Sequence, residues 1–337
     1  MYLGANVRIN KIGIVVIIAC LVILYLYASR RESALNVDNR NVISMKALLA
    51  GAIRAAEFGG LEVITVHDQA HITIKSKGKT KEGVNDPVTT ADYRSHCTMY
   101  RSLIEAFPKI IVISEEKSVG CDHVPMPDSK FSIKDLEMDH LGKDVAVSAS
   151  DVTVWIDPLD ATKEFTEDLL QYVTTMVCVT VKGEPVIGVI HKPFDSKRTY
   201  WSWIDHGSSE NLNNLPGPQK NKTPLLTVSR SHAGQVHTIA KAAFGEDVQV
   251  ISAAGAGYKA LELVVGNATA YIHTTAIKKW DICAGTAIIR ALGGTVTPLF
   301  GPPDISFGPT DSTSLSLGLL ATMKDHNWYH GKLSSHV

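Results

Sequence analysis

The chain has 337 residues, of which 45% are hydrophobic and 20% are charged, and its formal net charge is −1. A chain of this length and composition folds around a large core, as one big domain or as two packed halves. The near-neutral charge excludes a broad nucleic-acid-binding surface, which needs a clear basic excess. Recognition of phosphorylated molecules must therefore come from local charge.

The first regional feature is an uncharged, apolar segment at residues 12–28, which has basic residues on both sides. Its length just spans a thin bilayer, and the absence of a polar face argues against a buried core helix. A cleaved signal peptide is the alternative, although Tyr25, Leu26 and Tyr27 offer no small-residue cleavage site. We expect a tail at 1–11, a transmembrane signal-anchor at 12–28, a stem at 29–41 and a folded domain at 42–337.

Charge does not decide the orientation of this anchor, because basic residues lie on both flanks. The sequons at Asn221 and Asn267 permit glycosylation if the bulk of the chain is lumenal. Cys20 lies inside the anchor, and the other four cysteines are too scattered for a zinc site. We interpret those four as small buried thiols and leave disulfide pairing open.

Hydrophobic periodicity and turn residues divide the rest of the chain into helices and strands. Helices are expected at 42–66, 92–107, 233–244, 255–265 and 281–292. Strands are expected at 110–113, 152–156, 173–181, 185–191, 225–228 and 270–273. Residues 75–81 form a basic loop, which is a surface loop or an active-site flap, and 117–150 form a surface segment. The Asn-, Pro- and Gly-rich stretch 211–224 separates two halves, 42–215 and 222–325.

Carboxylates stand where several of these elements end or begin. Glu115, Asp157 and Asp160 follow strand-like runs, and Asp281 lies at a helix N-terminus, places where α/β proteins gather their sites. Clustered carboxylates repel one another unless a cation neutralises them, and oxygen ligands suit Mg²⁺. We expect two or three Mg²⁺ ions, which would polarise a phosphoryl group and lower the pKa of a bound water.

Other residues complete this predicted site. Pro158 breaks its strand, which frees the Leu159 carbonyl to ligate a cation. Asp92 and Thr162 form a carboxylate–hydroxyl pair of the kind that holds a water in line and accepts its proton. Thr162 alone is also explained as a helix cap.

Four motifs together resemble those of the lithium-sensitive inositol monophosphatase superfamily in order and spacing: DPVTTAD at 86–92, EE at 115–116, DPLDAT at 157–162 and WD at 280–281. The resemblance spans about residues 42–325. It implies an α/β (α+β) fold, a layered αβαβα sandwich, here preceded by one transmembrane helix. It also implies inhibition by Li⁺. The roles that it implies are metal ligation by Glu115, Asp157, the Leu159 carbonyl, Asp160 and Asp281, and activation of the water by Asp92 and Thr162.

The substrate needs a separate argument. Inositol monophosphatases carry an acidic residue seven positions before the final metal-binding aspartate, and Thr274 stands there in this chain; Lys278 and Lys279 favour an extra phosphate. The segments SRSH at 229–232 and GAGYK at 255–259 resemble the nucleotide-binding segments of 3′-nucleotidases that cleave 3′-phosphoadenosine 5′-phosphate. Contacts with the AMP portion are thereby implied for Ser229, His232, Gly255 and Lys259. A glycine-opened helix start beside a lysine suits an anion, although tight packing also explains Gly-x-Gly.

Anchor and resemblance together predict a single-pass type II Golgi membrane protein with a lumenal phosphatase domain. Its expected reaction removes the 3′-phosphate of 3′-phosphoadenosine 5′-phosphate and gives AMP and phosphate. The expected partners are this small molecule and the membrane, with no nucleic acid, and the oligomeric state, including a homodimer, stays open. An inositol bisphosphate or monophosphate phosphatase is the alternative enzyme. A catalytically silent, anchored nucleotide-binding or scaffold protein is the alternative from another class.

Overall fold

The computed structural model describes residues 17–27, 41–69, 73–79, 85–126, 141–213, 215, 223–230, 235–302 and 304–336. The chain divides into two compact units, Met1–Val42 and Ile43–Val337. In the first unit, residues 17–27 are helical. Within the described residues, no helix is both long enough and apolar enough to cross a membrane. The expected anchor at 12–28 extends outside the described residues at both ends.

Helices and strands are mixed along the folded part of the chain. The first half holds β1 (Val42–Ser44), α2 (Met45–Asp68), β2 (Ile74–Lys79), β3 (Asn85–Thr89), α3 (Thr90–Ala106), β4 (Ile111–Ser114), β5 (Ala146–Ser148), β6 (Val152–Asp160), α4 (Thr162–Thr166), β7 (Thr174–Val181), β8 (Glu184–Lys192), β9 (Arg198–Trp203), β10 (Gly207–Ser208) and α5 (Glu210–Asn213). The second half holds β11 (Leu225–Ser229), α6 (Val236–Phe244), β12 (Gln249–Ala253), α7 (Ala256–Val264), β13 (Ala270–His273), β14 (Ile277–Lys278), α8 (Lys279–Ala291), β15 (Thr295–Thr297), β16 (Ser314–Leu315), β17 (Leu319–Thr322) and α9 (His326–Ser334).

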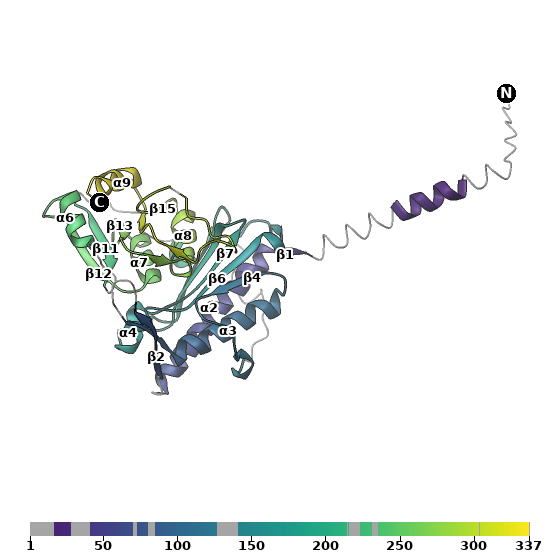
Figure 1. The fold of residues 1–337 in the computed structure, drawn as a ribbon, viewed down its shortest axis with the longest axis horizontal. Helices are drawn as coiled ribbons and strands as arrows, with labels where there is room; N and C mark the ends of the chain where they lie inside the picture. The colour runs from purple at the N-terminus through teal and green to yellow at the C-terminus, as the bar shows by residue number, and fades with distance from the viewer. Residues whose placement is uncertain are drawn as a thin grey trace, which may run out of the picture. The chain divides into compact units, whose positions relative to one another are not determined.

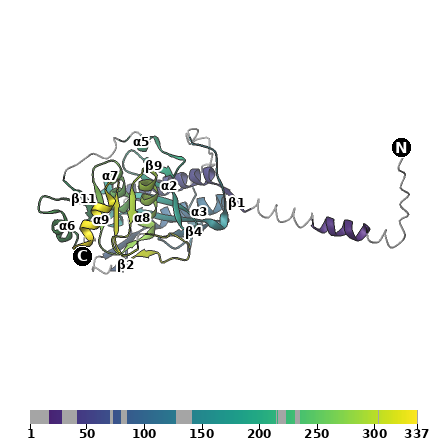
Figure 2. The ribbon, with the colours of Figure 1, turned by 90° about the horizontal axis from the view of Figure 1, so that it is seen from above.

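Two sheets and three helical layers stack in the second unit (Figure 1). Helices α2 and α3 cover one face of a six-stranded sheet of order β10-β9-β8-β7-β6-β4. Helices α7 and α8 lie between this sheet and a five-stranded sheet of order β12-β11-β13-β17-β15. Helices α6 and α9 cover the outer face of the second sheet (Figure 2). The layer order is helix, sheet, helix, sheet, helix, so the predicted αβαβα sandwich is confirmed.

Strand β6 shows why the larger sheet lies between two helical layers. Its residues from Val152 to Leu159 are all buried, as expected for a strand covered on both faces. Because side chains alternate along a strand, Val154 and Ile156 face the α2–α3 core while Trp155 packs toward α7 and α8. Both cores therefore meet at this strand, and its end carries several of the predicted site residues.

Helix α8 lies unusually close to the sheet at one point. A Cβ on Gly188 of β8 would collide with the Ala284 carbonyl oxygen and come within 3.0 Å of the Ala287 Cβ. A disulfide between Cys178 of β7 and Cys283 of α8 joins the same two layers. The position of Asp281, in the first turn of α8, is thus fixed by packing and by a covalent link.

Two sequence-based expectations about these elements are wrong in part. The basic loop predicted at 75–81 is an extended strand as far as Lys79, where β2 pairs antiparallel with β3. The strand predicted to end at Ile156 continues to Asp160, with an irregular pairing to β7 between Asp157 and Asp160. Pro158, which cannot donate to a strand ladder, explains this irregularity.

The four predicted thiols are paired as disulfides. Besides the bond between Cys178 and Cys283, Cys97 of α3 is bonded to Cys121. Cys20 is free and exposed. Sequence separations of 24 and 105 residues carry no pairing signal, because connectivity depends on which elements the fold brings together.

Candidate functional site

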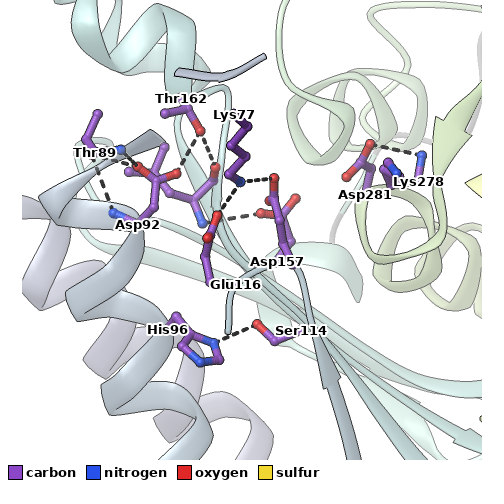
Figure 3. Close-up of polar contacts among 12 residues, drawn as sticks. Lys77, Thr89, Asp92, His96, Ser114, Glu116, Asp157, Thr162, Lys278 and Asp281 are labelled. Atoms are coloured by element: carbon purple, nitrogen blue, oxygen red, sulfur yellow. Dashed lines mark hydrogen bonds and ion pairs between the residues drawn. The ribbon is translucent and has the colours of Figure 1, made fainter. Parts of the chain in front are cut away.

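The site lies at one edge of the six-stranded sheet, where β4 and β6 end and β7 begins. Ser114 pairs with Ile156 in parallel register, and the Glu115 amide donates to the Ile156 carbonyl at 3.2 Å. Asp160 pairs with Thr174 across the antiparallel neighbour β7. Figure 3 shows the carboxylates of Asp92, Glu116 and Asp157 and the Thr162 hydroxyl around one space, with Asp281 across it on α8.

Asp92 and Thr162 form a direct hydrogen bond. Thr162 Oγ1 donates to Asp92 Oδ1 at 2.8 Å and lies 3.1 Å from the Leu159 carbonyl oxygen. The other Asp92 oxygen accepts from the Thr89 amide at 2.7 Å and from the Thr89 hydroxyl at 2.6 Å. Asp92 is fully buried, and burial raises its pKa to about 6. The pair predicted from sequence therefore exists, and Thr89 orients its carboxylate.

The structure does not support the helix-cap interpretation of Thr162. Ala161, with φ 69°, precedes the first residue of α4, and no side-chain cap hydrogen bond forms there. The Thr162 hydroxyl is directed to Asp92 and Leu159 instead. Asp92, in contrast, does close a capping box with Thr89 at the start of α3, so its carboxylate serves the helix end and the site together.

The remaining carboxylates raise one another's pKa. Burial, followed by the charges of Asp160, Glu115 and Asp281, raises the pKa of Asp157 well above its ordinary value. Burial raises the pKa of Glu115 to about 7, and burial together with the charges of Glu115 and Asp160 raises that of Asp281. Like charges that are gathered in a buried place favour the protonated form unless a cation is near. A nearby cation would therefore lower these pKa values.

Asp160 connects this cluster to the start of α7. Its Oδ2 accepts from the Gly257 amide at 2.8 Å and from the Thr174 hydroxyl at 3.2 Å. Gly255 has φ +68°, and a Cβ there would lie 3.0 Å from Asp160 Oδ2 and 2.8 Å from the Tyr172 carbonyl oxygen. Only glycine fits this left-handed, crowded turn. The predicted nucleotide loop and a predicted metal ligand are thus in direct contact.

Lys77 is a residue of the site that the sequence did not single out. Its Nζ lies 2.8 Å from Glu115 Oε1 and is also ion-paired with Glu116. Figure 3 shows the lysine pointing into the space beside Asp157 and Thr162. No local pattern in Lys75-Ser76-Lys77-Gly78-Lys79 distinguishes Lys77 from its neighbours, because its direction depends on an irregularity in the β2–β3 pairing.

The residues predicted to contact the AMP portion differ in burial and in hydrogen bonding. Ser229, at the end of β11, is nearly buried. Lys259 is 3% exposed, its Nζ donates to the Gly255 carbonyl at 2.6 Å, and burial lowers its pKa to about 8. Lys259 therefore stabilises the Gly255 turn through this hydrogen bond. His232 lies outside the described residues.

The two lysines expected to favour an extra phosphate do not act as a pair at the site. Lys279 is 6% exposed, and its Nζ lies 3.8 Å from Asp311 and 6.0 Å from the Phe307 ring centroid. Lys278 is exposed, with its Nζ 5.5 Å from the centroid of the Trp280 ring. The Lys279 charge is thus used in a structural ion pair, and the structure does not support the expected role of Lys279 in binding a second phosphate.

A divalent metal fits the chemistry of this donor set. Among the described residues, no group of three His, Cys, Asp or Glu side chains is arranged to hold a metal ion. The nearby donors are nevertheless all oxygens, which hard cations prefer. The carboxylate charges destabilise one another, and a lysine amine already contacts Glu115 and Glu116. Asp157, Glu115, Asp160, Asp281 and the Leu159 carbonyl are the residues that would hold such a cation.

Known proteins resemble this chain in sequence and in fold. A profile of the inositol monophosphatase family matches residues 44–334. The chain is 47% identical to putative inositol monophosphatase 3 of Drosophila melanogaster, over 99% of this chain and 96% of the relative. It is 45% identical to the Golgi-resident adenosine 3′,5′-bisphosphate 3′-phosphatase of Mus musculus, over 84% of this chain and 79% of the relative.

Solved structures share the layered fold. The extragenic suppressor protein suhB of Bartonella henselae superimposes with a TM-score of 0.63 at 17% identity, over 87% of this chain and 99% of that chain. The CysQ protein of Bacteroides thetaiotaomicron, described as a bacterial member of the inositol monophosphatase family, superimposes with a TM-score of 0.58 at 20% identity, over 83% of this chain and 98% of that chain. At these identities the likeness concerns the fold alone. Together with the family profile and the close relatives, it leads to one conclusion: the chain belongs to the inositol monophosphatase family of phosphatases.

Proposed function

We propose that this phosphatase removes the 3′-phosphate from 3′-phosphoadenosine 5′-phosphate, giving AMP and phosphate, and that it depends on Mg²⁺. The hydrogen-bonded Asp92–Thr162 pair beside the buried carboxylates carries the proposal for the chemistry. The Gly255 turn, which is in contact with Asp160, supports a nucleotide next to the reacting centre. Relatives named Golgi-resident adenosine 3′,5′-bisphosphate 3′-phosphatase support the same substrate.

Each residue of the pair has a defined task. Thr162 gives its hydroxyl hydrogen to Asp92, so its oxygen is left to accept a hydrogen bond from a water. Asp92 then receives the proton that the water loses, directly or through Thr162. The water oxygen bonds to phosphorus as the bond between phosphorus and the 3′-oxygen breaks. The 3′-oxygen leaves with the AMP and takes up a proton from solvent. Two Thr89 hydrogen bonds keep the carboxylate from turning away.

Two or three Mg²⁺ ions, held by Glu115, Asp157, Asp160, Asp281 and the Leu159 carbonyl, would supply the positive charge that stabilises the phosphoryl group. The carboxylates contribute by interacting before the substrate arrives; Asp157 is buried, and Glu115, Asp160 and Asp281 are half-buried. A site of this kind also accepts Li⁺, and we propose that millimolar Li⁺ inhibits the enzyme. Activity that does not respond to Li⁺ would contradict the proposed metal site.

We further propose that residues 12–28 anchor the chain in the Golgi membrane with the phosphatase domain in the lumen. The uncharged segment itself supports the anchor. Two disulfides in the described part of the chain support an oxidising compartment. Asn267 is exposed and suits lumenal glycosylation, while Asn221 lies outside the described residues. Protease protection of the folded domain in sealed microsomes, lost on adding detergent, tests this topology.

Hydrolysis of inositol phosphates remains the second candidate. Relatives named inositol monophosphatase 3 favour it, and the burial of Lys279 removes one argument against it. A silent scaffold is disfavoured because Asp92 and Thr162 keep their hydrogen bond.

Product identification tests the proposed reaction. The purified full-length protein in detergent should convert 3′-phosphoadenosine 5′-phosphate to 5′-AMP with Mg²⁺ and not with EDTA. Asp281→Asn serves as the inactive comparison. Release of the 5′-phosphate, or turnover that persists in EDTA, would contradict the proposal.

A further inference from the structure

Lys77 occupies a position in the site that the proposed reaction does not explain. Every residue of β2 is exposed when backbone and side chain are taken together. The side chain of Lys77, however, is only 25% exposed. Its amine lies 2.8 Å from Glu115 Oε1 and is ion-paired with Glu116 as well. One lysine thus neutralises two adjacent carboxylates, one of which is a proposed metal ligand.

The backbone of the β2–β3 hairpin directs this side chain. Ser76 pairs with Pro87 and Gly78 pairs with Asp86, so Lys77 between them has no partner in the ladder. Gly78 has φ +128°, and its amide donates to the Ser76 hydroxyl oxygen at 3.1 Å. A bulge of this kind inserts an extra residue and re-aims its side chain. The hairpin is therefore built to present one lysine at this point.

The positive charge of the Lys77 amine acts on the Glu115 carboxylate in the same direction as a metal ion would. Burial lowers the pKa of Lys77, but the charge of Glu115 and the hydrogen bonds to Glu115 and Glu116 raise it overall. In turn, the Lys77 charge lowers the pKa of Glu115 and of Asp92 against the effect of burial. An amine and a divalent cation that both bind Glu115 repel each other and compete for its carboxylate oxygens.

We infer that Lys77 is a positioning residue that holds Glu115 and Glu116 in the metal-free enzyme and is displaced when Mg²⁺ takes Glu115. This inference rests on the metal site proposed above. Displacement frees the amine and removes the ion pairs that tie the β2–β3 hairpin to the end of β4. Metal occupancy thereby controls the position of the hairpin beside the site.

Lysine labelling of the unmodified full-length protein tests this directly. A short pulse of an acetylating reagent, followed by peptide mass spectrometry, measures the reactivity of each amine with EDTA or with Mg²⁺. Lys75 and Lys79, which are exposed on the same strand, are internal controls. Lys77 should react about tenfold more slowly than both controls in EDTA, and Mg²⁺ should largely remove this difference.

Calorimetric titration with Mg²⁺ provides the matching measurement of affinity. Lys77→Met removes the competing charge and should bind Mg²⁺ about tenfold more tightly than the wild type. Lys77→Arg, which keeps the charge, and Lys75→Met, the matched control, should both stay near the wild-type affinity. Lys77→Met should also melt at a lower temperature in EDTA, with the difference reduced by Mg²⁺.

The outcomes separate this inference from the proposed function. If the wild type binds Mg²⁺ but Lys77 labelling does not change, the inference is wrong and the metal site stands. Unchanged or weaker Mg²⁺ binding by Lys77→Met also overturns it. If the wild type binds no Mg²⁺, the proposed metal site and the inference are both overturned.

Discussion

Replacing Thr162 by valine removes the hydroxyl from the Asp92–Thr162 pair while nearly keeping the side-chain shape. The lost contacts are the 2.8 Å bond to Asp92 and the 3.1 Å contact with the Leu159 carbonyl. General base catalysis contributes about 10²- to 10⁴-fold to a rate, so kcat should fall by that factor. Because Thr89 still donates two hydrogen bonds to Asp92, the free energy of unfolding should fall by only about 1–2 kcal/mol.

The assay compares kcat and KM for phosphate release at saturating Mg²⁺ with the denaturant midpoint of the same preparations. Thr162→Ser keeps the hydroxyl and is the matched control, which should stay within about tenfold of the wild-type kcat. KM should change little, since the hydroxyl does not contribute to binding in this account. A Thr162→Val enzyme that is folded and within about threefold of the wild-type kcat would refute the assigned role.

Three further predictions concern stability. The double substitution Cys178→Ala/Cys283→Ala opens a 105-residue loop and should lower the free energy of unfolding by about 2–5 kcal/mol; Cys20→Ala, at the free cysteine, should be neutral in the same denaturation assay. Gly188→Ala should cost about 1–3 kcal/mol because its Cβ meets the Ala284 carbonyl of α8, and an unchanged melting temperature would show that α8 moves away freely. Burial lowers the pKa of His96 to about 4, below its ordinary 6.5, so its neutral form stabilises the fold above pH 6.5. This contribution should fade as the pH drops from 6.5 to 4, and His96→Gln should flatten that part of the stability profile.

Hydrophobic patterning predicted the strands that end at the candidate site, whereas the layered fold was implied by the family resemblance. Apolar runs that are long and bounded by turn residues identify buried strands, and polar residues at their ends mark the sheet edge where sites assemble. Asp157 and Asp160, at the end of β6, follow this rule. Asp92 and Thr162 lie instead in the first turns of α3 and α4, and the motifs predicted them. The order and spacing of the four motifs along the chain then indicated the family.

Other features depend on tertiary contacts that no local pattern carries. The Cys178–Cys283 disulfide exists because α8 packs on β7. Lys279, taken for a phosphate ligand, has its Nζ 3.8 Å from Asp311 instead, since a lysine at a helix start can point in several directions. Lys77 required both the β2–β3 pairing and the bulge before its direction was defined.

A direct comparison of kcat/KM tests the central claim that this family member acts on the nucleotide. The purified full-length protein with Mg²⁺ is offered 3′-phosphoadenosine 5′-phosphate, inositol 1,4-bisphosphate and inositol 1-phosphate in parallel, and released phosphate is measured. The account predicts the largest kcat/KM for the nucleotide, with 5′-AMP as product and with the activity lost in Asp281→Asn. A larger kcat/KM for either inositol phosphate would contradict the assignment of substrate, and no turnover of any of the three would contradict the assignment of catalysis.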